Sequence, residues 1–493
     1  MAVLYRVLRQ VLRVALDLYF VDIQRVGELG VPERGPLIFA ANHPNSIMDT
    51  VILGAQTDRQ ICYMARNGLF ANPFSRFLFN QCGVIPIYRA QDDPAEVGRN
   101  SDSFSRAYEV LEGGGCIGIF PEGQNAPERH VRELKTGTAR IALEAEGRNA
   151  YELGVEIIPV GLNFEARSRF MSSVLVRFGE PIRAAKYADL HHHDPRGAVR
   201  ALTDEIQESL RSEAVHIDTH LTLQLVNDIH NIYGQRLQRD LFGDSVAASK
   251  KRSIKSFLMN QLRSSGELDK DLEDHFFIKQ RIADAVEHFS ARRPELVDRI
   301  RADVRRYKDH LNQIKLRAEF TERPEKSVSL RRESIKFTLY ALCFAIPALW
   351  GLLHNVAPYA IARTAWDLTR DEAMRSIRAF GVGFVVFPVF YGLQAWGLSH
   401  LVDMVPWWPW LIVLYVLSLP PTGFFWLRYS RQLTRYRDRI IARTFFRSNR
   451  NLIWALQRER EGLLRQFEHL KELFVQESGS KLAEHMARRD REA

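Results

Sequence analysis

Short apolar runs alternate with helical stretches along the first part of the chain. Six apolar runs, each five to eight residues long, have the pattern of buried strands; they cover 36–41, 60–64, 84–88, 116–120, 155–162 and 174–178. Stretches with helical periodicity lie between them, notably at 102–113 and 136–146. Strands that alternate with helices predict an α/β domain with a mixed sheet flanked by helices.

The polarity pattern divides the 493-residue chain into five parts. An N-terminal helix precedes the α/β domain, a charged helical extension follows it, and an apolar region leads into a basic and amphipathic helical tail. The predicted boundaries are 1–30, 31–190, 191–333, 334–427 and 428–493. A chain of this length is long enough for several domains.

The first 30 residues predict an amphipathic helix and not a signal peptide. Arg6, Arg9 and Arg13 interrupt the apolar residues, so no apolar core of signal-peptide length remains. A helix with a basic face can lie on an anionic membrane surface. The alternative is an ordinary first helix packed on the following domain, and the sequence leaves both open.

Three long stretches of the apolar region carry no full charge. The segments 380–399 and 405–427 each have about the 20 residues that a membrane span needs. The stretch 337–362 is equally apolar, but Pro347 and Pro358 interrupt it. The sequence therefore predicts two spans, preceded by a segment that can turn back at its prolines.

Arginines predict how these segments are oriented. Four lie at 363–378 and eight at 428–450, whereas the loop 400–404 contains neither Lys nor Arg. The positive-inside rule places the two basic segments in the cytoplasm. Because the residues before 337 are also basic, both ends of 337–362 should face the cytoplasm, and we expect a re-entrant or interfacial helical hairpin there.

Composition and charge limit the classes of protein and of binding partner that fit this chain. The net charge of +9 and the arginines that directly follow the last predicted span favour anionic membrane lipids over nucleic acid. A mean hydropathy of −0.22 excludes a polytopic transporter. The four cysteines form no CxxC pair and indicate neither disulfides nor a zinc site. The His-rich run 191–194 lacks metal-ligand spacing and predicts an exposed loop.

The first candidate for chemistry follows directly from the strand at 36–41. His43 and Asp49 lie in the run NHPNSIMD, at a strand end where α/β proteins place reactive groups. A histidine there can take a proton from a hydroxyl while a carboxylate holds its other ring nitrogen. Spacing alone also fits a loop histidine followed by a helix-capping aspartate.

The second candidate is the run Phe120-Pro121-Glu122-Gly123, which ends another strand. Glu122 can receive a hydroxyl or order the site, and Gly123 permits a close backbone approach. Arg89 follows the strand at 84–88, and Lys135 follows the FPEG run. Both are candidates for binding a phosphate group.

These motifs together resemble the glycerolipid acyltransferase superfamily, which includes glycerol-3-phosphate and lysophosphatidate acyltransferases. The resemblance covers about residues 1–185, and the four blocks occur in the family order. They are Asn42-His43 with Asp49, the run GVIPIYR ending at Arg89, FPEG at 120–123, and Ile158-Pro159-Val160.

The resemblance implies a role for each block. His43 is the general base and Asp49 orients it, whereas Arg89 contacts the phosphate and Glu122 and Gly123 bind the acceptor. The strand Ile158-Pro159-Val160 is associated with the acyl donor, which is acyl-CoA or acyl carrier protein. The reaction it implies needs neither a metal nor a bound cofactor, and a thioester donor places the catalytic domain on the cytoplasmic face. The sequence does not indicate an oligomeric state.

This chain departs from the common pattern in two ways, and the second leaves the acceptor open. Five residues separate His43 from Asp49, where most members have four, and Gln124 and Asn125 replace a Thr/Ser-Arg-Ser run that is common in lysophosphatidate acyltransferases. The HPNSIMD form looks most like the fungal-type glycerol-3-phosphate acyltransferases and their bacterial relatives. We therefore expect acylation of glycerol-3-phosphate, with a lysophospholipid acyltransferase or a non-catalytic lipid-binding membrane scaffold as the alternatives.

Overall fold

A computed structural model describes most of the chain. The described residues are 2–27, 31–71, 73–88, 98–125, 130–167, 170, 172–217, 220–242, 272–313, 330–369, 372–402, 407–448 and 450–478. They form two compact units. The first contains 1–216 and 361–385, and the second contains 217–360 and 386–493.

The first unit is built on a mixed sheet, which confirms the predicted fold class. Its strands are β1 (Asp22–Val26), β2 (Leu37–Ala41), β3 (Ile61–Arg66), β4 (Ile85–Ile87), β5 (Cys116–Ile119), β6 (Glu156–Phe164), β7 (Ser173–Phe178) and β8 (Ile182–Arg183). Their order is β1-β7-β6-β2-β5-β3-β4, with β8 beside β6. β2 pairs parallel with β5 and β6, whereas β6 and β7 are antiparallel.

The central strand β2 shows why this sheet forms. Leu37, Phe39 and Ala41 point into one apolar cluster, and Ile38 and Ala40 point into another. All five side chains are buried because helices cover both faces of the sheet. An uninterrupted apolar run is therefore the sequence signal for this strand, and a clean alternation would have indicated a half-exposed one.

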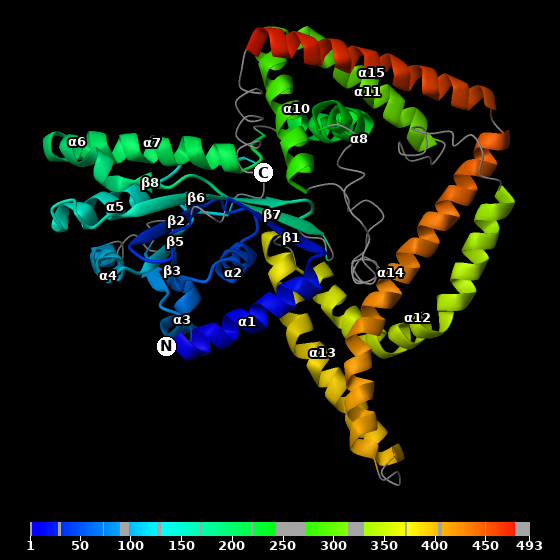
Figure 1. Cartoon of the computed structure of the whole chain (residues 1–493), viewed down its shortest axis with the longest axis horizontal. Helices are drawn as coiled ribbons and strands as arrows, with labels where there is room; N and C mark the ends of the chain where they lie inside the picture. The colour runs from blue at the N-terminus through cyan, green and yellow to red at the C-terminus, as the bar shows by residue number, and fades with distance from the viewer. Residues whose placement is uncertain are drawn as a thin grey trace. The chain divides into compact units, whose positions relative to one another are not determined.

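Helices lie on both faces of the sheet (Figure 1). One face is covered by α1 (Ala2–Tyr19) and α2 (Ile47–Gln56), and the other by α4 (Asn100–Glu112), α5 (Gly137–Arg148) and α7 (Pro195–Glu213). Shorter elements complete the unit: η2 (Asn67–Phe70), α3 (Pro73–Gln81), η4 (Ala184–Tyr187) and α6 (Ala188–His193).

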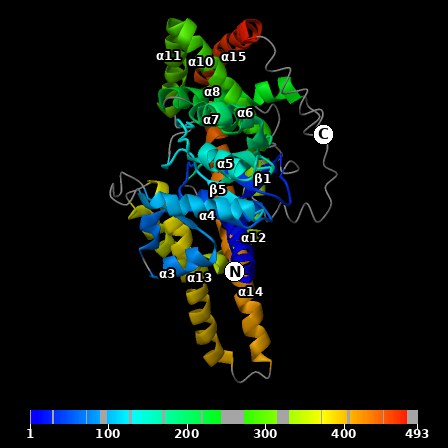
Figure 2. The same ribbon diagram turned by 90° about the vertical axis from the view of Figure 1, so that its left-hand side faces the viewer.

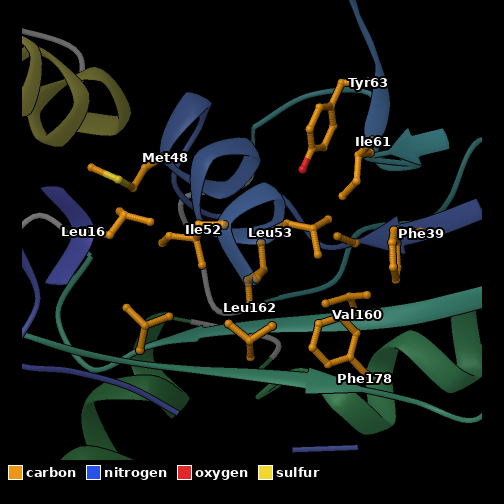
Figure 3. Packing of buried hydrophobic residues seen from close by; sticks show 14 of the residues in the cluster. Leu16, Phe39, Met48, Ile52, Leu53, Ile61, Tyr63, Val160, Leu162 and Phe178 are labelled. Carbon is orange, nitrogen blue, oxygen red and sulfur yellow. The ribbon is translucent and has the colours of Figure 1, made fainter. Parts of the chain in front are cut away.

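The packing of α2 on the sheet holds its first turn, where the candidate site begins, in one position. Its residues Met48, Ile52 and Leu53 are fully buried against the sheet, where they meet Phe39 and Leu162 (Figure 3). Burial of side chains of this size stabilises the fold by about 1.5–3 kcal/mol each. The first turn of α2 is therefore held firmly against the end of β2.

The structure differs from the prediction at one domain boundary and in one predicted loop. The α/β unit extends to residue 216 and not to 190, because α7 buries Leu202, Ile206 and Leu210 in the core of this unit. The predicted loop at 191–194 is mostly helical, since α6 ends at His193.

The N-terminal helix follows the packed-helix alternative. Arg13 donates from Nε to the carbonyl of Ala55 at 2.6 Å, and Arg9 donates from Nη1 to that of Asp58 at 2.6 Å. These cations lie at the C-terminus of α2, which attracts positive charge. The residues exposed on α1 are both apolar and polar: Val7 is 56% and Val14 52% exposed, and Arg6, Gln10 and Asp17 are also exposed. Contact of α1 with a membrane stays a prediction.

The second unit contains a bundle of α8 (His220–Phe242), α10 (Leu272–Arg292), α11 (Pro294–Gln313) and α15 (Arg450–Ser478). The rings of Tyr233 in α8 and Phe467 in α15 are tilted relative to each other, with centroids 5.7 Å apart, and both residues are buried. The helix α15 of the amphipathic tail therefore packs on this bundle through its apolar residues.

Three further helices carry the apolar region: α12 (Leu330–Asp367), α13 (Glu372–Val402) and α14 (Trp408–Ser448). Within them, Phe337–Asp367, Arg378–Leu401 and Trp408–Thr434 are long and apolar enough to cross a membrane. The later part of α13 runs beside the first part of α14 (Figure 2).

The predicted hairpin at 337–362 is wrong in one respect. The segment is a single helix with Pro347 and Pro358 inside it, and it bends partway along its length (Figure 1). Proline removes one helical hydrogen bond and kinks a helix without ending it. Whether α12 enters or lies along a bilayer stays a prediction.

Polar contacts hold α12 against its neighbours in the second unit. Asn355 donates from Nδ2 to the carbonyl of Leu419 at 3.2 Å and accepts from the Tyr391 hydroxyl at 2.6 Å. A Cβ on Gly351 would lie 1.9 Å from the carbonyl oxygen of Thr422, so only glycine permits this approach. Small residues and buried amides are the usual means of joining membrane helices.

Candidate active site

The candidate site lies where β2, β5 and β6 end. β2 ends at Ala41 and is followed by Asn42 and His43, and β5 ends at Ile119 and is followed by Phe120. Because these strands are parallel neighbours, their C-terminal ends meet at one edge of the sheet. The sheet therefore brings together residues that are about 80 positions apart in the sequence.

The predicted pair is in hydrogen-bonding contact. His43 Nδ1 lies 2.9 Å from Asp49 Oδ2, and the same oxygen accepts from the Asn45 amide at 2.7 Å. Asp49 is in the first turn of α2 and is fully buried, which raises the pKa of its carboxyl group. With Nδ1 bound to Asp49, Nε2 is the ring nitrogen that can take a proton from a substrate.

Two further contacts orient the imidazole. The Phe120 ring stacks on the His43 ring, with centroids 4.1 Å apart and planes 19° apart. The Asn42 side chain bridges to β6, accepting from the Leu162 amide at 2.7 Å and donating to its carbonyl at 3.2 Å. The His43 ring and the backbone that carries it are thus held in one orientation.

The loop before α2 has a strained backbone and is held in place by a hydrogen bond. Ser46 has a φ of 55°, a left-handed conformation that is uncommon outside glycine. Its amide donates to Asn125 Oδ1 at 3.0 Å. Strain of this kind is found where the surrounding structure enforces it, often at functional sites. Asn125, which departs from the common family pattern, is therefore a positioning residue here.

Glu122 orders the site through the backbone. Its carboxylate accepts from the His43 amide at 3.0 Å and from the Arg132 amide at 3.4 Å. The residue is only 3% exposed. Burial raises the pKa of Glu122 to about 7, although these two amides and the charge of His43 oppose the shift.

This pKa gives a pH-dependent prediction for stability. Free glutamate has a pKa of about 4.3, so between roughly pH 4.5 and 7 the folded protein binds more protons than the unfolded chain. Its stability should therefore fall as the pH rises through this window. Glu122→Gln keeps an oxygen acceptor for the His43 amide and removes the titration, so it should reduce the fall by roughly 1–3 kcal/mol.

The measurement is the unfolding temperature of the detergent-purified protein, followed by intrinsic fluorescence from pH 4.5 to 7.5. Glu109→Gln, which changes an exposed glutamate of α4, is the matched control and should keep the wild-type slope. Equal slopes in the wild type and Glu122→Gln would contradict the assignment of this proton to Glu122.

The other predicted site residues fall into three groups. Lys135 crosses over Gly123, where a Cβ would lie 2.7 Å from its Nζ, and Gly123 has a φ of 70°. Ile158 and Val160 are fully buried in the core below α2, so their role in donor binding stays a prediction, as does that of Pro159. Arg89 lies outside the described residues.

Arg167 was missed by the sequence reasoning. It lies after β6, and its Nη1 donates to the carbonyl of Pro44, 123 positions away, at 3.2 Å. No local pattern marks such a contact. For Phe120 and Asn125 a signal existed, since both lie in or next to the FPEG block.

Comparison with known proteins adds a family assignment to this geometry. Residues 22–163 match the family model for Acyltransferase. The chain therefore carries a domain of the acyltransferase family.

Its relatives include enzymes of glycerolipid synthesis. Glycerol-3-phosphate O-acyltransferase 1 of Saccharomyces cerevisiae is 24% identical over 52% of this chain and 45% of its own length. Glycerol-3-phosphate O-acyltransferase 2 of the same yeast is 31% identical over 27% of this chain and 18% of its own length. The 1-acyl-sn-glycerol-3-phosphate acyltransferase of Borreliella burgdorferi is 25% identical over 35% of this chain and 63% of its own length. This chain thus matches less than half the length of either yeast relative.

Proposed function

We propose that the protein transfers a fatty acyl group from a thioester, acyl-CoA or acyl carrier protein, to glycerol-3-phosphate. The observation that carries the proposal is the contact of His43 Nδ1 with buried Asp49 at the end of β2, within an acyltransferase domain. The names of the two yeast relatives favour glycerol-3-phosphate as the acceptor.

The chemistry follows from the two ring nitrogens. His43 Nε2 takes the proton of the acceptor hydroxyl as its oxygen attacks the thioester carbonyl. Asp49 stabilises the imidazolium that forms. The tetrahedral intermediate then expels the thiolate, which receives the proton from His43, so an ester and a free thiol are the products.

The test is an acceptor panel with labelled acyl-CoA and purified protein. Glycerol-3-phosphate, dihydroxyacetone phosphate and 1-acylglycerol-3-phosphate are compared at equal concentrations. We expect the highest kcat/KM for glycerol-3-phosphate. The Borreliella relative gives the second candidate, and preference for 1-acylglycerol-3-phosphate would select it. If no acceptor is acylated, with either acyl-CoA or acyl carrier protein as the donor, the alternative of a non-catalytic lipid-binding membrane scaffold would be favoured.

We further propose that the catalytic domain faces the cytoplasm and that the basic part of α14 binds anionic lipid. The arginines at 363–378 and 428–450 support this orientation, because basic segments remain on the cytoplasmic side. Cytoplasmic acyl-CoA or acyl carrier protein would then reach the site directly.

Cysteine labelling tests this orientation. Single cysteines at 329, 368 and 403 are introduced into a cysteine-free background and treated with a membrane-impermeant reagent. Leu368 is chosen because it is 73% exposed, whereas its neighbour Thr369 is buried. Position 403 should label in intact cells, and positions 329 and 368 only after permeabilisation. Labelling of 329 and 368 from opposite sides would contradict the model and make α12 a full span.

A further inference from the structure

A small pocket opens beside the catalytic loop of the α/β unit. Asn42 and Pro44, which flank His43, form one side of it, and Glu122 and His130 form another. Arg167 completes the lining together with apolar residues at the end of β6. Among the described residues that line this pocket, Arg167 is the only arginine or lysine.

The loop that carries Arg167 is fixed to the catalytic loop in both directions. Arg167 Nη1 donates to the carbonyl of Pro44 at 3.2 Å, and Asn45 donates from Nδ2 to the carbonyl of Arg167 at 3.1 Å. The positive charge also lowers the pKa of Asp49 against the stronger effect of burial. Pro44 and Asn45 directly follow His43, and the Asn45 amide donates to Asp49, so Arg167 lies beside the loop that carries this pair.

The charges around the pocket favour an anion. Glu122 is the only carboxylate among the described lining residues, and burial holds its pKa near neutrality, so near pH 7 it carries only part of its negative charge. Gln124 and Asn125 directly follow the FPEG run, and the side chain of Asn125 accepts a hydrogen bond from the Ser46 amide. A guanidinium with planar N–H donors is well suited to bind a phosphate.

We propose that Arg167 binds the phosphate group of the acceptor and thereby selects phosphorylated acceptors. This rests on the proposed function.

The kinetic test separates acceptor binding from positioning. Arg167→Gln keeps an amide donor for the Pro44 carbonyl and removes the charge, whereas Arg167→Lys keeps the charge and loses the planar fork. Losing a charge-assisted bond should raise the KM for glycerol-3-phosphate roughly 10- to 100-fold in Arg167→Gln. The KM for acyl-CoA should change less than about twofold, kcat should fall by a smaller factor than the KM for glycerol-3-phosphate rises, and Arg167→Lys should recover part of the loss. Arg183→Ala, at an exposed arginine of β8, is the matched control.

A binding test makes the inference independent of turnover. Inorganic phosphate, at constant ionic strength, should raise the unfolding temperature of the wild type and of Arg183→Ala, but not that of Arg167→Gln. An unchanged KM for glycerol-3-phosphate, or a loss confined to kcat, would overturn the proposal. So would equal stabilisation of wild type and Arg167→Gln by phosphate. If the wild type is stabilised by phosphate in an Arg167-dependent way but acylates no glycerol-phosphate, the anion site stands and the proposed function fails.

Discussion

His43→Ala is expected to abolish acyl transfer and to leave the fold intact. The imidazole is the only described group at the end of β2 that is both held by a buried carboxylate and able to accept a proton. Loss of a general base typically lowers the rate by ~10²–10⁴-fold. Part of the His43 ring is exposed, at 20%, so its removal should cost little stability.

The measurement is the initial rate of transfer from labelled acyl-CoA to glycerol-3-phosphate by purified protein. His193→Ala, which removes an exposed histidine of α6 in the same unit, is the matched control and should retain the full rate. Unfolding temperatures of both variants should stay close to the wild type. A near-normal rate in His43→Ala would exclude the proposed mechanism.

Asp49→Asn is expected to have the second largest effect, a fall in kcat of ~10²–10⁴-fold. Asp49 Oδ2 accepts from the Asn45 amide while it lies 2.9 Å from His43 Nδ1. An asparagine cannot neutralise the imidazolium. If its NH₂ group turns toward Nδ1, the ring keeps its proton on Nε2 and cannot act as a base.

The alternative role of Asp49 is that of an acidic residue in the first turn of a helix, which contributes about 0.3–1 kcal/mol. Asp102→Asn is the matched control, because Asp102 is exposed in the first turn of α4. A helix-terminus role would lower the unfolding temperature and leave kcat nearly unchanged in both variants. A catalytic role lowers kcat in Asp49→Asn alone. Normal kcat in that variant would refute the orienting role.

The central strands could be predicted from the sequence because burial on both faces requires apolar residues at nearly every position. β2, β5 and β6 are buried on both faces, so each appears as a continuous apolar run. β1 was missed because it is an edge strand with the mixed sequence DIQRV, and β8 because it has only two residues. Neither has a hydrophobic pattern long enough to recognise.

The sequence also predicted the pairing of His43 with Asp49, because the pair is local. A strand end, a short loop and the first turn of a helix place His43 within hydrogen-bonding distance of Asp49, six positions later. The family resemblance supplied their roles. The choice between a loop histidine and a base could not come from spacing alone.

Only the tertiary structure decided what surrounds this pair. Glu122 and Asn125 each reach the catalytic loop from 79 positions away, and Arg167 from 123. It also turned Arg9 and Arg13 of α1 toward the protein and kept α12 helical through its prolines. Such contacts depend on which strands pair and which faces pack, and a linear pattern records the polarity of a residue but not the partner that the fold brings to it.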